Sequence, residues 1–157
     1  MKITFIWIGK TTEQWLQEGI DVYLKRLKHY VNLTIEIIPA PKNMPKNDVE
    51  KQKEMEGDAI LGRIAASDEV YLLDERGQTF TSEELANLLQ KKMLSSAKHI
   101  VIVVGGAFGF SEKIYKRANG QISFSKLTFS HQMIRLLLCE QIYRAFTIIR
   151  GEAYHHF

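Results

Sequence analysis

The C-terminal segment of this chain concentrates side chains that can exchange protons or bind an anion. The segment RGEAYHHF includes five such groups: Arg150, Glu152, Tyr154, His155 and His156. A terminus that carries tyrosine and histidine near a ligand pocket could close over a substrate and move a proton. A metal site is the weaker interpretation, because the chain offers no second cluster of Cys, His or paired carboxylates to complete a ligand set. We therefore predict no metal, and an expression tag is the other alternative for the paired histidines.

A glycine-rich segment is the second candidate for ligand binding. Residues 105–109, GGAFG, follow a run of branched apolar residues and precede a helical pattern. Glycine allows the backbone to approach a ligand closely, and the start of the following helix can favour an anion. The segment lacks the GxGxxG spacing of dinucleotide-binding loops, and about twenty residues further on the chain has Ser125 and Lys126 instead of an acidic residue. A ligand loop and a structural strand-to-helix turn remain equal alternatives.

Two further polar segments follow predicted strands. Residues 74–77 (DERG) would be a solvated turn if they stood alone, and residues 124–129 (FSKLTF) would be a packed connector. In parallel sheets, however, ligands bind beyond the carboxyl ends of the strands. We expect segments 74–77, 105–109 and 125–130 to meet at that edge, where their backbone could line one pocket.

Hydrophobic periodicity predicts five strands alternating with helices. Thr11 with Gln14, and Asn47 with Glu50, have the spacing of capping boxes. Ser130 should cap the last helix and Gly151 should end it, and proline indicates a loop at 39–46. Strands are predicted at Lys2–Ile8, Leu33–Ile38, Glu69–Leu73, His99–Val104 and Gln121–Ser125. Helices are predicted from Thr11 to about Tyr30, from Asn47 to about Ala66, and at Ser82–Leu94, Ser111–Ala118 and His131–Ile149.

This alternation predicts an α/β fold with a mainly parallel sheet of five to six strands and helices on both faces. At 157 residues, the chain is most simply a single domain spanning 1–157. Its 45% hydrophobic and 25% charged residues are globular values, which argue against disorder.

The last predicted helix is apolar around almost its whole circumference when it is projected at about 100° per residue. Such a helix is buried on several sides, so one side should meet a second subunit. Glu140 and Arg144 are spaced for an ion pair, since a buried charge is costly unless it is paired. A structural pair and a substrate role remain equal alternatives. Cys139 has apolar neighbours and is predicted to be a core residue, not a nucleophile.

Charge and cysteine content limit the possible partners and compartment. A formal net charge of +3 tolerates an anionic partner such as RNA, but histone-like nucleic-acid binders are far more basic. No apolar run approaches the ~18 residues of a membrane span, and MKITFIWIGK is expected to be a strand, not a signal peptide. The single cysteine excludes an internal disulfide and fits a cytoplasmic location.

Four segments carry a resemblance to a known family. They are VVGGAFG (103–109), SFSKLTFSHQMIR (123–135), EQIYRAF (140–146) and RGEAYHH (150–156). With MKITFIWIGK at the start and YLKRL at 23–27, they make the chain resemble the RlmH family of SPOUT-class methyltransferases along essentially its whole length. Members of that family methylate N3 of a pseudouridine in large-subunit (23S) ribosomal RNA.

The resemblance implies a C-terminal trefoil knot, which would be an exception to the rule against threaded chains. It also implies S-adenosylmethionine as methyl donor, a homodimer, and the assembled ribosome as substrate, with no DNA or membrane partner. Carried over by position, the donor would contact Leu73, Gly105, Phe124, Ser125, Lys126, Leu127, Thr128 and Phe129.

Transfer from a sulfonium donor requires alignment with the attacking nitrogen and removal of that nitrogen's proton. We expect Tyr154 and His155 to act near the target base, and Arg144 or Arg135 to orient the base or a phosphate. The alternative from another class is a noncatalytic ribosome-associated RNA-binding factor. A Rossmann-like oxidoreductase is disfavoured by the missing acidic residue and the late position of the glycine loop.

Overall fold

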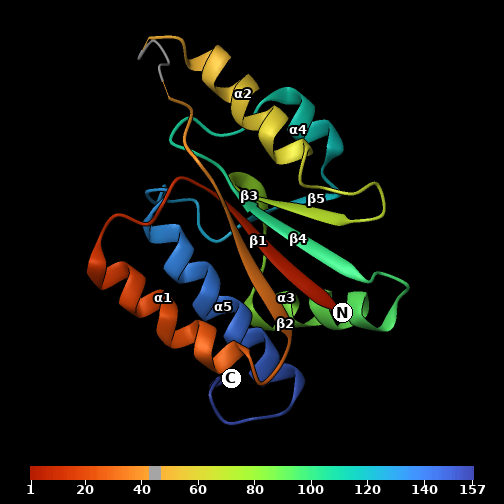
Figure 1. Ribbon diagram of the computed structural model, residues 1–157. Helices are drawn as coiled ribbons and strands as arrows, with labels where there is room; N and C mark the ends of the chain where they lie inside the picture. The colour runs from red at the N-terminus through yellow and green to blue at the C-terminus, as the bar shows by residue number, and fades with distance from the viewer. Residues whose placement is uncertain (43–46) are drawn as a thin grey trace.

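The computed structural model describes residues 1–42 and 47–157, so residues 43–46 of the predicted loop lie outside the described residues. Strands and helices alternate along the described chain (Figure 1). The strands are β1 (Lys2–Ile8), β2 (Asn32–Ile38), β3 (Glu69–Thr79), β4 (His99–Val104) and β5 (Gly120–Ser123). The helices are α1 (Gln14–Leu27), α2 (Val49–Leu61), α3 (Ser82–Leu94), α4 (Glu112–Arg117) and α5 (Met133–Ile149).

The five strands form one sheet in the order β2-β1-β4-β3-β5, and every neighbouring pair is parallel. This confirms the predicted α/β fold with a parallel sheet, at the lower end of the expected five to six strands for the residues described. Parallel neighbours require long crossover connections, which the helices provide. Because all strands run in one direction, their carboxyl ends share one edge of the sheet.

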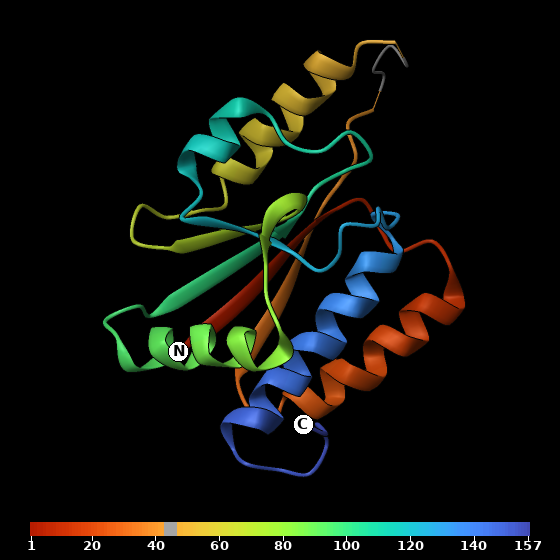
Figure 2. The ribbon, with the colours of Figure 1, turned by 180° about the vertical axis from the view of Figure 1, so that it is seen from behind.

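Helices cover both faces of the sheet. Figures 1 and 2 show α1, α3 and α5 on one face, and α2 and α4 on the other. Side chains alternate along β1 accordingly: Phe5 and Trp7 belong to the core under the first group, and Ile6 and Ile8 to the core under the second. The central strand β4 is buried from Ile100 to Val104, since both of its faces are covered.

Three helix starts differ from the predictions by two or three residues. Neither predicted capping box forms: the N-cap of α1 is Glu13, without a side-chain cap, and the N-cap of α2 is Asp48, whose Oδ1 accepts the Lys51 N–H at 3.0 Å. Thr11 is engaged elsewhere, because its hydroxyl accepts a hydrogen bond from Arg135. α5 begins at Met133, two residues later than expected, although the Ser130 hydroxyl accepts the Met133 N–H at 3.1 Å as a cap would.

Two other boundaries differ from the predictions by more than three residues. α2 ends at Leu61, well before Ala66, because the chain tightens into a turn in which the Arg63 N–H bonds to the Ile60 carbonyl at 2.9 Å. β3 continues past Leu73 to Thr79, with an irregularity in its pairing to β5 between Leu73 and Gln78. Residues 74–77, which were predicted to form a turn, therefore lie inside a longer strand, at the place where its pairing with β5 is irregular.

Candidate functional site

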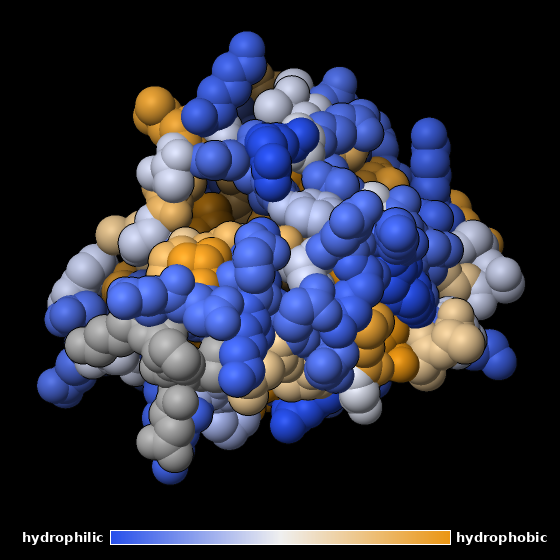
Figure 3. Space-filling model, turned by 90° about the horizontal axis from the view of Figure 1, so that it is seen from above, coloured by the Kyte–Doolittle hydropathy of each residue, from blue (hydrophilic) through white to orange (hydrophobic). Residues whose placement is uncertain are grey.

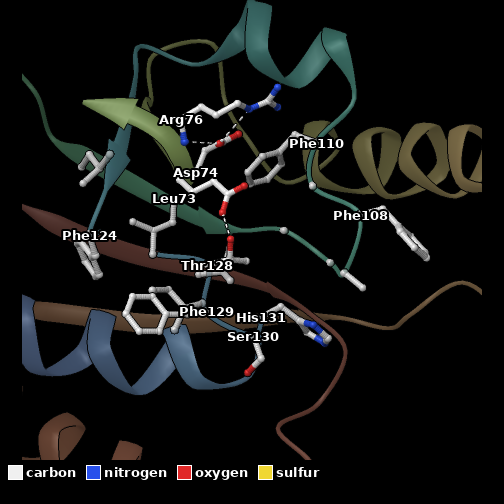
Figure 4. A pocket seen from close by; sticks show the side chains of 18 of the residues that line it. Leu73, Asp74, Arg76, Phe108, Phe110, Phe124, Thr128, Phe129, Ser130 and His131 are labelled. Carbon is white, nitrogen blue, oxygen red and sulfur yellow. Dashed lines mark hydrogen bonds and ion pairs between the residues drawn. The ribbon is translucent and has the colours of Figure 1, made fainter. Parts of the chain in front are cut away.

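A pocket opens at the carboxyl edge of the sheet, where β4 and β5 end and the pairing of β3 with β5 is interrupted (Figure 4). Its volume is about 610 Å³, within the ~300–1,000 Å³ typical of small-molecule and cofactor sites. Residues 73–76, 104–110, Tyr115, Ile122, Phe124, Ser125, 127–131 and Ile134 line it. The three segments singled out in the sequence therefore converge, although Gly77 and Lys126 are not part of the lining.

The glycine loop between β4 and α4 is closely packed against Phe110 and against Glu56 of α2. Gly109 has φ of 82°, in the left-handed region that favours glycine. A Cβ at Gly105 would lie 3.1 Å from the Phe110 ring, and a Cβ at Gly106 would lie 2.5 Å from Oε1 of Glu56. These glycines line the pocket with backbone atoms alone, so the loop is both a compact turn and a pocket wall.

Glu56, on α2, lies against the glycine loop behind the pocket and was not predicted from the sequence. Its side chain is 4% exposed, and Oε2 has no hydrogen-bond partner among the described residues. Burial raises the pKa of its carboxyl group, partly opposed by a hydrogen bond from Gln52 to Oε1 at 3.4 Å. The available signal was the Glu56-Gly57 pair inside a charged helix, because glycine in a helical pattern often marks close packing.

A polar network forms the wall of the pocket at the β3 interruption. The Tyr115 hydroxyl donates to Asp74 Oδ2 and accepts from Arg76 Nη2 at 3.0 Å. The Asp74 side chain is only 8% exposed, and its Oδ1 accepts the Arg76 N–H at 2.9 Å, which shapes the turn. Burial, followed by the bond to Asp74, raises the pKa of Tyr115. Asp74 is thus fixed in place by Tyr115 of α4.

The connection from β5 to α5 forms the opposite wall. β5 lies at one edge of the sheet, whereas the start of α5 contacts the end of β1, so the connection passes across the ends of β3 and β4. The Ser125 hydroxyl accepts the Leu127 N–H at 2.9 Å, and the Thr128 hydroxyl donates to Glu75 across the pocket. Lys126 is exposed. This connection is tied to β3 and is not a detached linker.

The surface above these segments is mainly hydrophilic. Figure 3, which views the molecule from above, shows apolar surface in recesses between hydrophilic residues. Several apolar residues of the pocket segments are well exposed: Leu127 at 73%, Phe108 at 45% and Phe129 at 39%. Figure 4 shows Phe108 directed away from the other labelled side chains. Exposed apolar groups of this size at a pocket are available for a ligand or a partner.

Arg135 fixes the start of α5 against the end of β1. Its side chain is fully buried, and its N–H groups donate to the carbonyls of Ile8 at 2.7 Å, Gly9 at 3.0 Å and His131 at 3.1 Å. The guanidinium carbon lies 5.2 Å from the centre of the Trp7 ring. Burial lowers the pKa of Arg135 to about 10. Because these donors are occupied by the backbone, Arg135 is a structural residue here and the predicted base- or phosphate-orienting role is not supported.

The tail residues form a hydrogen-bonded cluster around the second half of α5. Arg144 Nη2 donates to Glu140 Oε1 at 2.5 Å, which confirms the predicted ion pair. The Tyr154 hydroxyl donates to the same oxygen at 3.0 Å. His155 contacts Arg144 Nη1 through Nδ1 and Glu83 Oε1 on α3 through Nε2, both at 3.2 Å. Burial and the hydrogen bonds of its hydroxyl raise the pKa of Tyr154.

This cluster is separated from the pocket of the same chain. Ile134, near the start of α5, lines the pocket, and Arg144 is ten residues further along the helix, or about 15 Å at 1.5 Å per residue. Neither Arg144, Tyr154 nor His155 lines the pocket. Cys139, between the two regions, is fully buried and burial raises its pKa to about 12, so it is a core residue as predicted.

The arrangement is suited to binding and alignment of a small molecule against a second substrate. Within residues 1–42 and 47–157, no group of three or more His, Cys, Asp or Glu side chains is placed to hold a metal ion. Over the same residues, no helix is both long enough and apolar enough to cross a membrane. The pocket itself offers glycine backbone, aromatic surface and carboxylates held by hydrogen bonds.

Comparison with known proteins identifies the family. Residues 1–155 match the family model described as "Predicted SPOUT methyltransferase". The Flavobacterium johnsoniae protein named "Ribosomal RNA large subunit methyltransferase H" is 52% identical over 156 residues, which cover 99% of both chains. Proteins of the same name from Cytophaga hutchinsonii and Parabacteroides distasonis are each 50% identical, over 99% of this chain and 100% and 99% of their own lengths. This chain therefore belongs to the SPOUT methyltransferase family.

Proposed function

We propose that this chain transfers a methyl group from S-adenosylmethionine to N3 of a pseudouridine in large-subunit (23S) ribosomal RNA, on the assembled ribosome. The observation that carries the proposal is the convergence of three backbone segments, 73–76, 104–110 and 124–131, on one pocket at the carboxyl edge of a parallel sheet. The full-length match to relatives named for ribosomal RNA large-subunit methylation supports the same reaction.

The residues around the pocket fit a nucleoside-containing sulfonium donor. Leu73, Phe124 and Phe129 supply apolar surface for a purine, and Gly105 supplies backbone that a ligand can approach closely. Asp74 is next to Leu73 and adds negative charge, which attracts a cationic sulfur. The donor, when bound, supplies an electrophilic methyl group. The residues that would hold it are Leu73, Gly105, Phe124, Ser125, Leu127, Thr128 and Phe129, with Lys126 contributing backbone only.

We further propose that the active protein is a homodimer and that its active site combines two subunits. Trp15 and Val22 are 54% and 47% exposed on α1, which packs beside α5 (Figure 1). Two large apolar side chains exposed on one helix indicate a surface that another protein covers. A second copy on this surface, running in the opposite direction, would bring its Arg144, Tyr154 and His155 toward the pocket of the first copy.

In this site the tail residues would handle the RNA base. His155 would accept the proton that N3 loses, Arg144 would orient the base or a neighbouring phosphate, and Tyr154 would hold the base edge through its hydroxyl. The Tyr154–Glu140 and Arg144–Glu140 hydrogen bonds support this assignment, because they fix both side chains in the free protein and reduce the entropy lost on substrate binding. We also propose that the β5–α5 connection is knotted, as family membership implies.

Two measurements test the proposed function. Isothermal titration calorimetry should detect one S-adenosylmethionine per chain, and purified protein should transfer a labelled methyl group to ribosomes isolated from cells that lack the modification. Protein-free ribosomal RNA should be a much poorer acceptor. A noncatalytic ribosome-binding factor would bind ribosomes but neither bind the donor nor transfer label, and that result would reject the proposal.

A further inference from the structure

We propose that Glu83 on α3 is a positioning residue for His155, holding the imidazole as the tautomer with its proton on Nε2 and its lone pair on Nδ1. The inference rests on the proposed function, in which His155 accepts a proton, and adds a residue to it. Glu83 Oε1 lies 3.2 Å from His155 Nε2, and Arg144 Nη1 lies 3.2 Å from His155 Nδ1.

The chemistry of the two neighbours determines the tautomer. A guanidinium nitrogen is a donor and cannot accept a hydrogen bond, so Nδ1 must be the acceptor in its contact with Arg144. An ionised carboxylate only accepts, so Nε2 must carry the proton that is donated to Glu83. Both contacts are therefore satisfied by one neutral form of His155. The other tautomer would place two donors against each other at Nδ1 and two acceptors against each other at Nε2.

The groups facing this imidazole come from several elements. Glu83 comes from α3, Arg144 comes from α5 and is paired with Glu140, and the Phe157 ring packs edge-on at 4.9 Å between ring centres. The His155 side chain is 13% exposed. Of these ionisable neighbours, Glu83 is the carboxylate in hydrogen-bond contact with the ring, so it is the group that can hold the proton on Nε2.

Glu83 is not required for the local helix structure. The N-terminus of α3 is already capped by Thr81 and Glu84, which form a reciprocal capping box with bonds of 3.1 Å and 2.7 Å. The Glu83 carboxylate instead reaches the tail, which is 72 residues further along the chain. A hydrogen bond to its own backbone N–H, followed by the contact with His155, lowers the pKa of Glu83, and the backbone bond suits a carboxylate in a first helical turn.

The tautomer has a consequence for methyl transfer. When Arg144 Nη1 bonds to the RNA instead of to His155, with the Arg144–Glu140 bonds kept, the Nδ1 lone pair becomes free to take the proton from N3 of the base. The N3–methyl bond then forms as the sulfur–methyl bond breaks; the sulfonium becomes a neutral thioether, and His155 becomes an imidazolium. The Glu83 carboxylate faces that new positive charge, as the buried carboxylate does in a Ser-His-Asp triad.

Nitrogen NMR of protein labelled with ¹⁵N-histidine tests the tautomer directly, and a His155→Gln variant assigns its signals. In the wild type, neutral His155 should carry its proton on Nε2. In an Arg144→Met background, which removes the donor to Nδ1 and leaves Glu83 facing the ring, Glu83→Ala should shift His155 toward the Nδ1–H tautomer, whereas Glu83→Gln should retain the Nε2–H tautomer because an amide oxygen also accepts. Glu112→Ala is the matched control, since Glu112 lies in the first turn of α4. The same tautomer with and without Glu83→Ala in the Arg144→Met background would overturn the proposal.

Methylation rates complete the test. Glu83→Ala should lower the rate on ribosomes by about 10- to 100-fold, with S-adenosylmethionine affinity unchanged and partial rescue in Glu83→Gln. This is smaller than the about 10⁴-fold loss in a triad with a buried carboxylate, because the Glu83 side chain is 39% exposed. A Glu83→Ala rate equal to that of Glu112→Ala would refute the positioning role. An inactive wild-type protein would instead reject the proposed function, and the NMR result would still decide the tautomer.

Discussion

The contact between Gly106 and Glu56 leads to a quantitative prediction for Gly106→Ala. The new Cβ would lie 2.5 Å from Glu56 Oε1 and 3.0 Å from Oε2, and ordinary contacts begin near 3.4 Å. Glu56 is buried against the loop, so either its carboxylate must take another rotamer in a packed environment, or α2 or the glycine loop must move. Overpacking of this kind costs about 1–3 kcal/mol.

That cost should appear in donor binding, since Gly106 is part of the pocket wall. If the loop absorbs the displacement, S-adenosylmethionine affinity should fall by roughly 5- to 150-fold, taking about 1.4 kcal/mol per factor of ten. Calorimetry measures this affinity. In the background of Glu56→Ala, which removes the clashing carboxylate, the same Gly106→Ala change should cost much less, so the double variant should bind better than the sum of the single losses predicts.

The control is Gly62→Ala at the end of α2, where a Cβ would meet only backbone oxygens at 3.5 Å and 3.6 Å. Its donor affinity should match that of the wild type. Wild-type affinity in Gly106→Ala, or a loss that is equally large with and without Glu56, would show that Glu56 does not support the loop as described.

Three further outcomes are expected. His155→Ala should reduce methyl transfer by about 100- to 10,000-fold with donor affinity nearly unchanged, whereas equal losses in both would refute its role at the base. Because the pKa of Glu56 is raised in the folded state, the stability of the wild type should decline as pH rises from about 4.5 through the folded-state pKa. Glu56→Gln should therefore have a higher urea midpoint than the wild type at pH 8 but not at pH 4. A difference in midpoint that is the same at both pH values would contradict this sign. Arg135→Met should lower the free energy of unfolding by about 3 kcal/mol or more, because several buried carbonyls lose their donor, and a loss below about 1 kcal/mol would show that water or neighbouring groups replace it.

The sheet and the meeting of the three pocket segments were predictable from short-range patterns. The branched run His99–Val104 identifies a central parallel strand, and polar segments that follow parallel strands must share an edge. The prediction for β3 was wrong because Leu73 ends the apolar run, while strand pairing with β5 resumes at Gln78. Pairing after an interruption depends on the neighbouring strand, and the local sequence does not encode it.

The side-chain contacts between distant elements could not be predicted. Arg135 was expected to orient the base or a phosphate, but it donates to carbonyls at and just after the end of β1, more than a hundred residues earlier. Glu56 resembled one more charge on a charged helix, since only the packing of α2 on the glycine loop buries it. The family resemblance supplied the roles of Tyr154 and His155, and their distance from the pocket of the same chain became evident from the structure.

The most direct test of the central claim is mass spectrometry of nucleosides from large-subunit ribosomal RNA. It compares cells that lack this chain, cells that express the wild type, and cells that express His155→Ala. We predict that N3-methylpseudouridine is absent without the chain, is restored by the wild type, and is largely missing with the variant. Persistence of the methylated nucleoside in cells that lack the chain would contradict the account.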